Sequence, residues 1–190
     1  MKNNILKSTL ILVLAITLAS FTSLSEKNVD VTKSNITWKA YKVTGSHSGI
    51  VSLKSGSLNF DNDKLTGGTF IVDMTSIKTT DMQGKSATNL DNHLKSDDFF
   101  SVESHPLANI NFKAVKSSGK NSYTVNADLT IKGKTNPVSF EMSIYGNKAT
   151  ASLKVDRTKY GIEYKSNSFF DNLKDKAIYD EFDLIVDLQF

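Results

Sequence analysis

The sequence predicts an all-β protein of roughly eight antiparallel strands, and two observations carry this prediction. Apolar and polar residues alternate one by one along most of the chain, which places the apolar side chains of each strand on one face. Short clusters of glycine, asparagine, aspartate and serine separate the alternating runs, as expected for turns. Strands that follow one another across short turns pair in antiparallel fashion.

The alternation is clearest in five segments, the first with Ile36, Trp38 and Ala40 on its apolar parity. The segments span residues 36–40, 123–131, 138–144, 149–155 and 182–190. The apolar face of each must be buried, and either a barrel or a sandwich would bury it. A barrel of eight strands has an interior just wide enough for one small elongated ligand.

Four predicted turns divide the strands, at residues 61–63, 116–121, 133–137 and 146–147. Gly146 and Asn147 stand between two alternating runs and predict a tight hairpin. Residues 45–49 form a polar stretch with a glycine at each end. We interpret this stretch as a turn at the rim of the barrel.

Two segments break the strand pattern. Residues 85–95 carry Ala87, Leu90 and Leu94 at helical spacing, which predicts one short helix with Ser86 as its cap. Residues 166–178 are polar and predict a loop or a helical turn before the last strand. The sequence contains no internal repeat or linker, and we therefore expect one domain.

The N-terminal residues have the features of a secretory signal peptide. Lys2 and Lys7 give a basic start, residues 9–19 are apolar, and small residues continue through Ser25. The apolar run is shorter than the roughly 20 residues that span a bilayer. An uncleaved membrane anchor is the alternative interpretation.

We therefore expect a signal peptide over residues 1–25 and a single domain over residues 26–190. Cleavage after Ala19 or after Ser25 would both satisfy the preference for small residues. The mature chain is then periplasmic or secreted, with no stable membrane span. It contains no cysteine, so its core must hold it together without disulfide bonds.

The charge distribution argues against nucleic acid as a partner. The formal net charge is +3, and loss of Lys2 and Lys7 with the signal peptide lowers it to +1. Lysines and acidic residues are interspersed, without the basic block of a nucleic-acid-binding protein.

The residues that could carry chemistry do not form a recognisable catalytic or metal motif. The three histidines lie on separate segments, the acidic pairs lie in turn-like stretches, and no G-x-S-x-G motif is present. We therefore expect no enzyme activity, no metal and no cofactor. An enzyme that uses the barrel cavity as its pocket remains the weaker alternative.

Several elements in order resemble a known family. They are 35–48 (NITWKAYKVTGSHS), 67–81 (GGTFIVDMTSIKTTD), 89–100 (NLDNHLKSDDFF), 128–138 (DLTIKGKTNPV) and 156–161 (DRTKYG). Together they resemble the YceI-like family of secreted lipid- and polyisoprenoid-binding proteins, over nearly the whole mature chain. One departure is Leu90, where many relatives carry arginine; Arg157 is the only arginine in the chain.

The resemblance implies an extended, lipocalin-like antiparallel barrel around an apolar channel that holds a long isoprenoid or acyl chain. We expect Trp38, Phe70, Met74, Phe112, Leu129 and Phe140 to line that channel. Phe99, Phe100 and Tyr160 would lie near an entrance, and His47 and Arg157 are the candidates for contact with a lipid head group.

Two questions stay open at this point. Periodicity does not separate an open channel from a filled core, and a homodimer is one open oligomeric state.

A small outer-membrane β-barrel is the main alternative in function, because such proteins also have about eight alternating strands. In that alternative the apolar parity would face lipid outside the barrel, and Phe190 would be the characteristic terminal residue.

Overall fold

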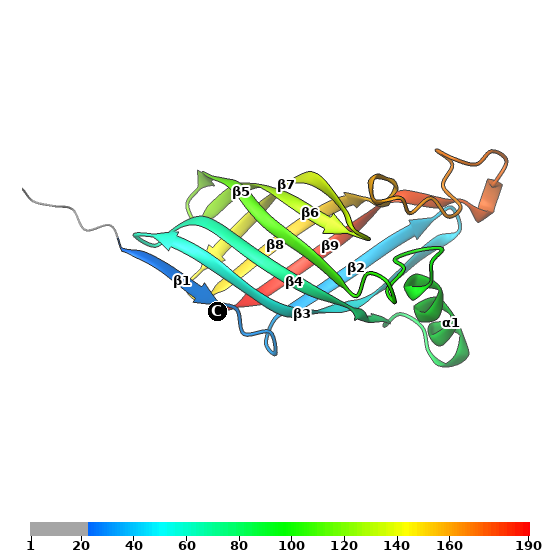
Figure 1. Cartoon of the computed structure of the whole chain (residues 1–190), viewed down its shortest axis with the longest axis horizontal. Coiled ribbons are helices and arrows are strands. Elements are labelled where there is room, and N and C mark those ends of the chain that lie inside the picture. Colours follow the sequence, from blue (N-terminus) through cyan, green and yellow to red (C-terminus); the bar gives the residue numbers. More distant parts are fainter. Residues whose placement is uncertain (1–22) are drawn as a thin grey trace, which may run out of the picture.

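The computed structural model describes residues 23–190, in which nine strands and one α-helix follow one another along the chain (Figure 1). The strands are β1 (Leu24–Asn28), β2 (Asn35–Lys42), β3 (Gly45–Asp61), β4 (Lys64–Thr79), β5 (Leu107–Gly119), β6 (Ser122–Ile131), β7 (Lys134–Tyr145), β8 (Lys148–Asp156) and β9 (Ile178–Gln189). The helix α1 (Gly84–Lys95) follows β4, and two 3-10 helices, η1 (Arg157–Tyr160) and η2 (Lys174–Lys176), follow β8.

Eight of the strands close into an antiparallel barrel, as the sequence predicts. Their order is β3-β2-β9-β8-β7-β6-β5-β4, and pairing of β3 with β4 closes the ring. The strand β3 is long enough to have two partners along one edge. Its first half pairs with β2, and its last residues, Ser57 to Asp61, pair with β1.

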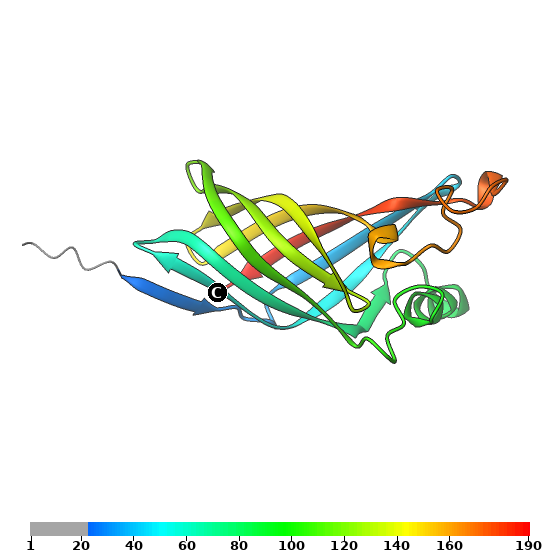
Figure 2. The same ribbon diagram turned by 45° about the horizontal axis from the view of Figure 1, so that its top comes forward.

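The two ends of the barrel differ in their connections, as Figures 1 and 2 show. At one end, here called the hairpin end, two-residue turns join β3 to β4, β5 to β6 and β7 to β8. At the other, here called the α1 end, lie the helix α1 and two long connections, residues 80–106 and 157–177. The β2–β3 and β6–β7 turns also lie at the α1 end.

Turn residues with positive φ explain several of the hairpins. Asn62 and Asp63 have φ of 47° and 63°, and Lys132 and Gly133 have φ of 50° and 71°. Two consecutive residues of this kind match the right-handed twist of the paired strands. The predicted hairpin at Gly146 is confirmed, with φ of 61° at that glycine.

The predicted turn at residues 133–137 is wrong in its extent, because the turn ends at Gly133 and Pro137 lies inside β7. Proline has no N–H to donate to a neighbouring strand, so it is usually confined to a free edge. Here Pro137 pairs with Asp128 on one side, while β8 begins to pair with β7 only at Glu141. The β7 edge beside Pro137 is therefore free of a β8 partner.

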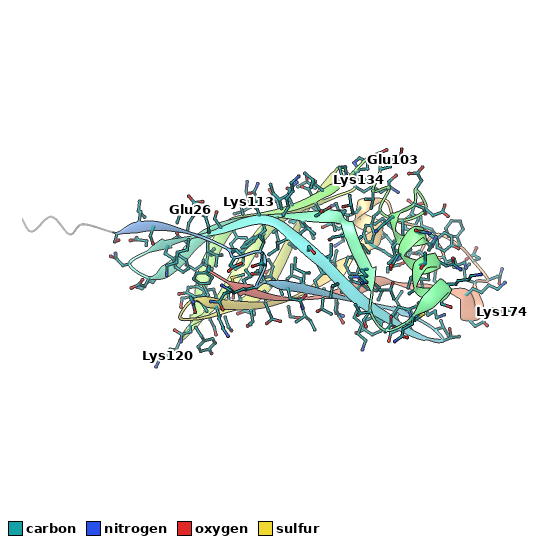
Figure 3. All side chains as sticks on the ribbon, turned by 90° about the horizontal axis from the view of Figure 1, so that it is seen from below. Glu26, Glu103, Lys113, Lys120, Lys134 and Lys174 are labelled. Atoms are coloured by element: carbon teal, nitrogen blue, oxygen red, sulfur yellow. The ribbon has the colours of Figure 1, made fainter. Side chains whose placement is uncertain are left out.

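The apolar parity of the strands faces the interior. In β8, the side chains of Ala149, Ala151, Leu153 and Val155 are buried, and their neighbours Lys148, Thr150, Ser152 and Lys154 are exposed. Figure 3 shows charged side chains such as Lys113, Lys120 and Lys134 on the outside of the molecule. The barrel therefore has an apolar interior and a polar outer face.

The predicted turn at residues 45–49 is wrong: these residues form the first part of β3, and the turn lies at Val43 and Thr44. The two glycines have separate roles. Gly45 has a φ of 147°, a backbone conformation that residues with a side chain rarely adopt. Gly49 leaves room for the ring of Trp38 on β2. A side chain at Gly49 would place its Cβ 2.5 Å from Trp38 Cζ2.

The predicted helix is confirmed as α1, although its cap is not Ser86. The N-cap residue is Gln83, which makes no side-chain capping hydrogen bond. The helix is held to the barrel by Asp91, whose Oδ1 accepts a hydrogen bond from the backbone N–H of Thr79 (2.7 Å), and by the buried Leu94. The predicted loop at 166–178 contains η2.

The predicted signal peptide lies outside the described residues except for its last three. Of these, Leu24 and Ser25 already belong to β1 and pair with Asp61 and Phe60. The cleavage site itself stays a prediction.

Candidate functional site

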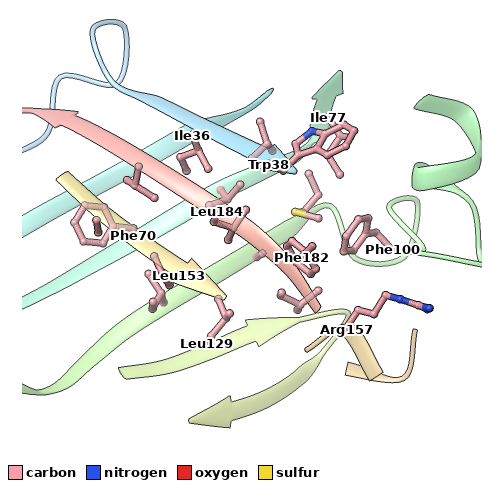
Figure 4. Close-up of a pocket in the computed structure, with 18 of the residues that line it drawn as sticks. Ile36, Trp38, Phe70, Ile77, Phe100, Leu129, Leu153, Arg157, Phe182 and Leu184 are labelled. Atoms are coloured by element: carbon pink, nitrogen blue, oxygen red, sulfur yellow. The ribbon is translucent and has the colours of Figure 1, made fainter. Parts of the chain in front are cut away.

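The barrel encloses a cavity of about 150 Å³, lined by inward-facing side chains of all eight barrel strands (Figure 4). The strand β9 alone contributes side chains from Ile178 to Leu188. Ten residue steps at about 3.3 Å correspond to roughly 33 Å of strand, so the lining extends along most of the barrel. A volume of this size over such a length means that the cavity is narrow.

All six residues predicted to line a channel do line this cavity. They are Trp38, Phe70, Met74, Phe112, Leu129 and Phe140. Phe99 and Phe100, predicted to lie near an entrance, also belong to the lining and come from the segment after α1. What these side chains bind stays a prediction.

Two other predicted site residues lie away from the cavity lining. Tyr160 is 1% exposed in η1, where burial raises the pKa of its phenol to about 12. His47 lies on β3, and its Nδ1 is 3.1 Å from the carboxylate of Asp81 on the surface. Neither side chain is among those that surround the cavity.

Aromatic rings fill the part of the barrel nearer the hairpin end. The ring of Phe112 lies 5.7 Å from the rings of Phe70 and Phe140, measured between centroids. Gly56 and Gly68 make room for this group, because a Cβ on either would meet the ring of Phe70 or Phe112 within about 3 Å. The same three phenylalanines therefore form both core packing and cavity wall.

The opposite part of the cavity is lined by Trp38, Met74 and Ile77 on β2 and β4, and by the segment after α1. Between Asp73 and Lys78 a bulge interrupts the pairing of β4 with β3. Four residues of β4 lie there opposite one residue of β3. Asp73 Oδ1 accepts hydrogen bonds from the backbone N–H and the hydroxyl of Thr75 (3.0 and 2.6 Å), which fixes this bulge. The bulge turns both Met74 and Ile77 inward.

Arg157 is the charged side chain among the described lining residues, and it is 2% exposed. Its Nη1 donates to the carbonyl of Ile162 (2.7 Å), its Nη2 to the carbonyl of Ile178 (3.0 Å), and its Nε to the carbonyl of Tyr179 (3.1 Å). Nη2 also lies 3.4 Å from Asp180 Oδ1. Burial lowers the pKa of the guanidinium, and Asp180 opposes that shift.

These bonds explain how Arg157 shapes the cavity. In β9, three residues between Ile178 and Phe182 oppose one residue of β2, so the strand bulges just beyond the end of β8. Arg157 satisfies the backbone carbonyls of Ile178 and Tyr179 at this bulge. Its guanidinium also lies 5.6 Å from the centroid of the Phe99 ring, a cation–π distance. With four donor contacts made, most of its five N–H groups are already occupied.

Sequence reasoning missed several lining residues. Ile77, Ile178 and Tyr179 belong to the two bulges, where the period of two is interrupted. Others, such as Ala151 and Leu153, stand on the apolar parity of a predicted strand, and the alternation alone could have found them. The alternation of apolar and polar residues does not identify the bulge residues as part of the lining.

Within residues 23–190, no group of three or more histidine, cysteine, aspartate or glutamate side chains is arranged to hold a metal ion. In the same range, no helix combines the length and apolar character needed to cross a membrane.

Fold and cavity together define a class: a closed eight-stranded antiparallel barrel with an apolar interior. Residues 28–190 match the YceI-like domain, and the chain belongs to this family. Among curated relatives, a UPF0312 protein of Pseudomonas putida strain W619 is 34% identical over 91 residues. That match covers 48% of this chain and 45% of the relative, so this chain spans less than half the length of the curated relative.

Two solved structures have the same fold. BcnA of Burkholderia cenocepacia superposes with a TM-score of 0.66 at 22% identity, covering 84% of this chain and 98% of that one. A polyisoprenoid binding domain from Saccharophagus degradans superposes with a TM-score of 0.61 at 13% identity, covering 87% and 97%. At these identities the likeness is one of fold.

Proposed function

We propose that this protein is an exported carrier that holds a long apolar lipid, a polyisoprenoid or an acyl chain, inside the barrel. The observation that carries the proposal is the lining of a cavity that follows most of the length of β9 and is apolar apart from Arg157. Each buried CH₂ group of a ligand contributes about 0.8 kcal/mol, so a long chain needs few polar contacts. Membership in the YceI-like family and the fold shared with a polyisoprenoid binding domain support the same conclusion.

The orientation of the strand faces favours this function over a small outer-membrane barrel. A barrel embedded in lipid has apolar residues outside and polar residues inside. Here Ala151 and Leu153 face inward, and Ser152 and Lys154 face outward. The same arrangement favours binding over catalysis, since hydrocarbon side chains surround the ligand and the guanidinium of Arg157 is engaged by the backbone.

A long ligand would widen the cavity when it enters. Ligand pockets commonly measure about 300–1,000 Å³, and the cavity is about 150 Å³. Met74 and Met142 in the lining have flexible side chains that can adopt other rotamers. We therefore infer that the lipid separates side chains that otherwise pack together across the barrel.

Export is part of the proposal and rests on the predicted N-terminal signal peptide. Cleavage after Ala19 would leave β1 complete, whereas cleavage after Ser25 would remove Leu24 and Ser25 from their pairing with β3. The intact β1 therefore favours the earlier cleavage site.

The test is native mass spectrometry of the mature protein, purified without detergent from a host that exports it, followed by solvent extraction. We expect a discrete adduct of lipid mass that passes into the organic solvent. The variant Ala151→Phe fills the cavity and should reduce the adduct strongly, and Ser152→Phe, the next residue on the outer face, should leave it unchanged. A wild-type protein at its bare mass in every preparation, or equal adducts in both variants, would contradict the proposal.

A further inference from the structure

Two buried polar side-chain atoms flank Gly49: one belongs to Trp38, which lines the α1 end of the cavity, and the other to Thr79, which lies just outside the lining. Trp38 on β2 and Thr79 on β4 both pair directly with Gly49 of β3, so all three residues lie on the same inner face. Trp38 is 8% exposed and Thr79 is 3% exposed. Within residues 23–190, neither Trp38 Nε1 nor Thr79 Oγ1 has a hydrogen-bond partner.

The missing side chain of Gly49 leaves room for the indole of Trp38 over β3. The indole of Trp38 lies across the glycine, with Cε2 only 2.7 Å from the position that a Cβ would occupy. Nε1 is bonded to Cε2, so the N–H lies above β3 and not above its own strand. Thr79 pairs with the same glycine from β4, on the side of β3 opposite to β2.

Two of the nearby backbone groups are already engaged. The N–H of Thr79 donates to Asp91 Oδ1 (2.7 Å), and the carbonyl of Ser48 accepts from the N–H of Thr80 (3.0 Å). Buried polar atoms are nearly always hydrogen-bonded in native proteins. Two such atoms at one glycine, beside a wall otherwise made of hydrocarbon, therefore point to a partner that the protein itself does not supply.

We propose that Trp38 Nε1 and Thr79 Oγ1 form the polar anchor of the lipid cavity and hold a neutral oxygen of the ligand. This inference rests on the proposed function. Indole is a donor, and a hydroxyl can both donate and accept. A carbonyl oxygen would accept from both groups, and a ligand hydroxyl would accept from Trp38 and donate to Thr79.

The charge of the surrounding residues sets the class of ligand. Burial of an ionised group is costly unless it is paired. Arg157 is the cationic side chain in the described lining, and three backbone carbonyls and Asp180 already engage it. The end of the lipid that enters at Trp38 is therefore an alcohol, a ketone or a similar neutral group, and not a phosphate.

The chain offers a direct probe, because Trp38 is its only tryptophan. A ¹⁵N-labelled, delipidated protein gives one indole N–H signal, whose proton shift reports hydrogen bonding. We would titrate it with geranylgeraniol, with phytane (a branched alkane of the same carbon number) and with geranylgeranyl diphosphate. We expect a downfield shift of the indole proton with the alcohol and no such shift with the alkane.

Competition between the alcohol and the alkane gives a second readout. From an equimolar mixture, the wild type should retain the alcohol with a preference of about tenfold, as one neutral hydrogen bond permits. Trp38→Phe and Thr79→Val should each reduce this preference. Thr69→Val, at an exposed position of the same strand, is the matched control and should not change it.

The remaining outcomes would overturn either the anchor alone or the carrier function as well. An unchanged preference in both Trp38→Phe and Thr79→Val, or tighter binding of the diphosphate than of the alcohol, would overturn the anchor while leaving the carrier function intact. Binding of none of the three probes would refute the carrier function, and the anchor with it.

Discussion

The hairpin end and the α1 end of the barrel are stabilised in different ways. At the hairpin end, neighbouring strands are joined by short local turns, which contain Asn62, Asp63 and Gly146 with positive φ. At the α1 end, the contacts join residues far apart in the chain. Arg157 connects η1 to the β9 bulge, and Asp91 connects α1 to β4. Substitution of one residue at the α1 end should therefore destabilise several segments together.

The largest expected effect is at Arg157. Arg157→Met keeps much of the side-chain volume but leaves the carbonyls of Ile162, Ile178 and Tyr179 without their donor. Removal of one partner from a buried charged network costs about 3–5 kcal/mol. Urea unfolding of the variant and the wild type measures this difference in the free energy of unfolding.

The matched control is Lys154→Met, on the outer face near the end of β8, three residues before Arg157, where the lysine pairs with Asp183 in an exposed position. Exposed ion pairs contribute little to stability, so this variant should remain close to the wild type. Equal losses at the two positions would remove the distinction between the buried network and the surface.

A smaller effect is expected from Gly49→Ala. The new Cβ would lie 2.1 Å from the carbonyl oxygen of Lys78 and 2.5 Å from the Trp38 ring, so both the β4 backbone and the ring must move. Overpacking of this kind costs about 1–3 kcal/mol. The emission maximum of Trp38 should shift as well, and both quantities can be followed in one unfolding experiment.

Gly119→Ala provides the comparison at the hairpin end, where a Cβ would meet Ser122 Cβ at an ordinary 3.7 Å. A glycine replaced without strain changes stability by no more than about 1 kcal/mol, usually in the favourable direction. If Gly49→Ala were as well tolerated as Gly119→Ala, the close approach of the indole would not constrain the α1 end.

The smallest expected effect is at Asp30, between β1 and β2 at the hairpin end. The ion pair with Lys33 (2.8 Å) and the hydrogen bonds from Thr32 lower the pKa of this carboxyl to about 2. A lowered pKa in the folded state stabilises the protein above the unfolded pKa of about 3.9, and this contribution disappears as the pH falls through 2. Asp30→Asn should therefore lower Tm slightly at pH 7, and the difference should disappear well below pH 2. A difference in Tm that persists well below pH 2 would assign the effect to another cause.

The hairpin end is also the part that the sequence predicts best. Alternation identified the strands and their buried faces, and glycine and asparagine identified the hairpin at Gly146, because both signals are local. Alternation placed Phe70, Phe112 and Phe140 on the inner face, and the resemblance to the YceI-like family implied that they line a channel; all three line the cavity.

The α1 end was predicted less well. Residues 45–49 look like a loop because of their glycines, yet Gly49 lies inside a strand to admit an indole from the neighbouring one. Arg157 was identified as a candidate for contact with a head group, but its main partners are carbonyls 5, 21 and 22 residues away. Neither fact can be derived from spacing, because both depend on which segments the closed barrel brings together.

The narrow cavity also determines how the barrel responds to hydrostatic pressure. Unfolding eliminates internal void, which makes the volume change on unfolding more negative and allows hydrostatic pressure to favour the unfolded chain. The void inside the barrel measures about 150 Å³. A lipid that fills the cavity would remove much of this compressible space, so the loaded barrel would resist pressure that unfolds the empty one.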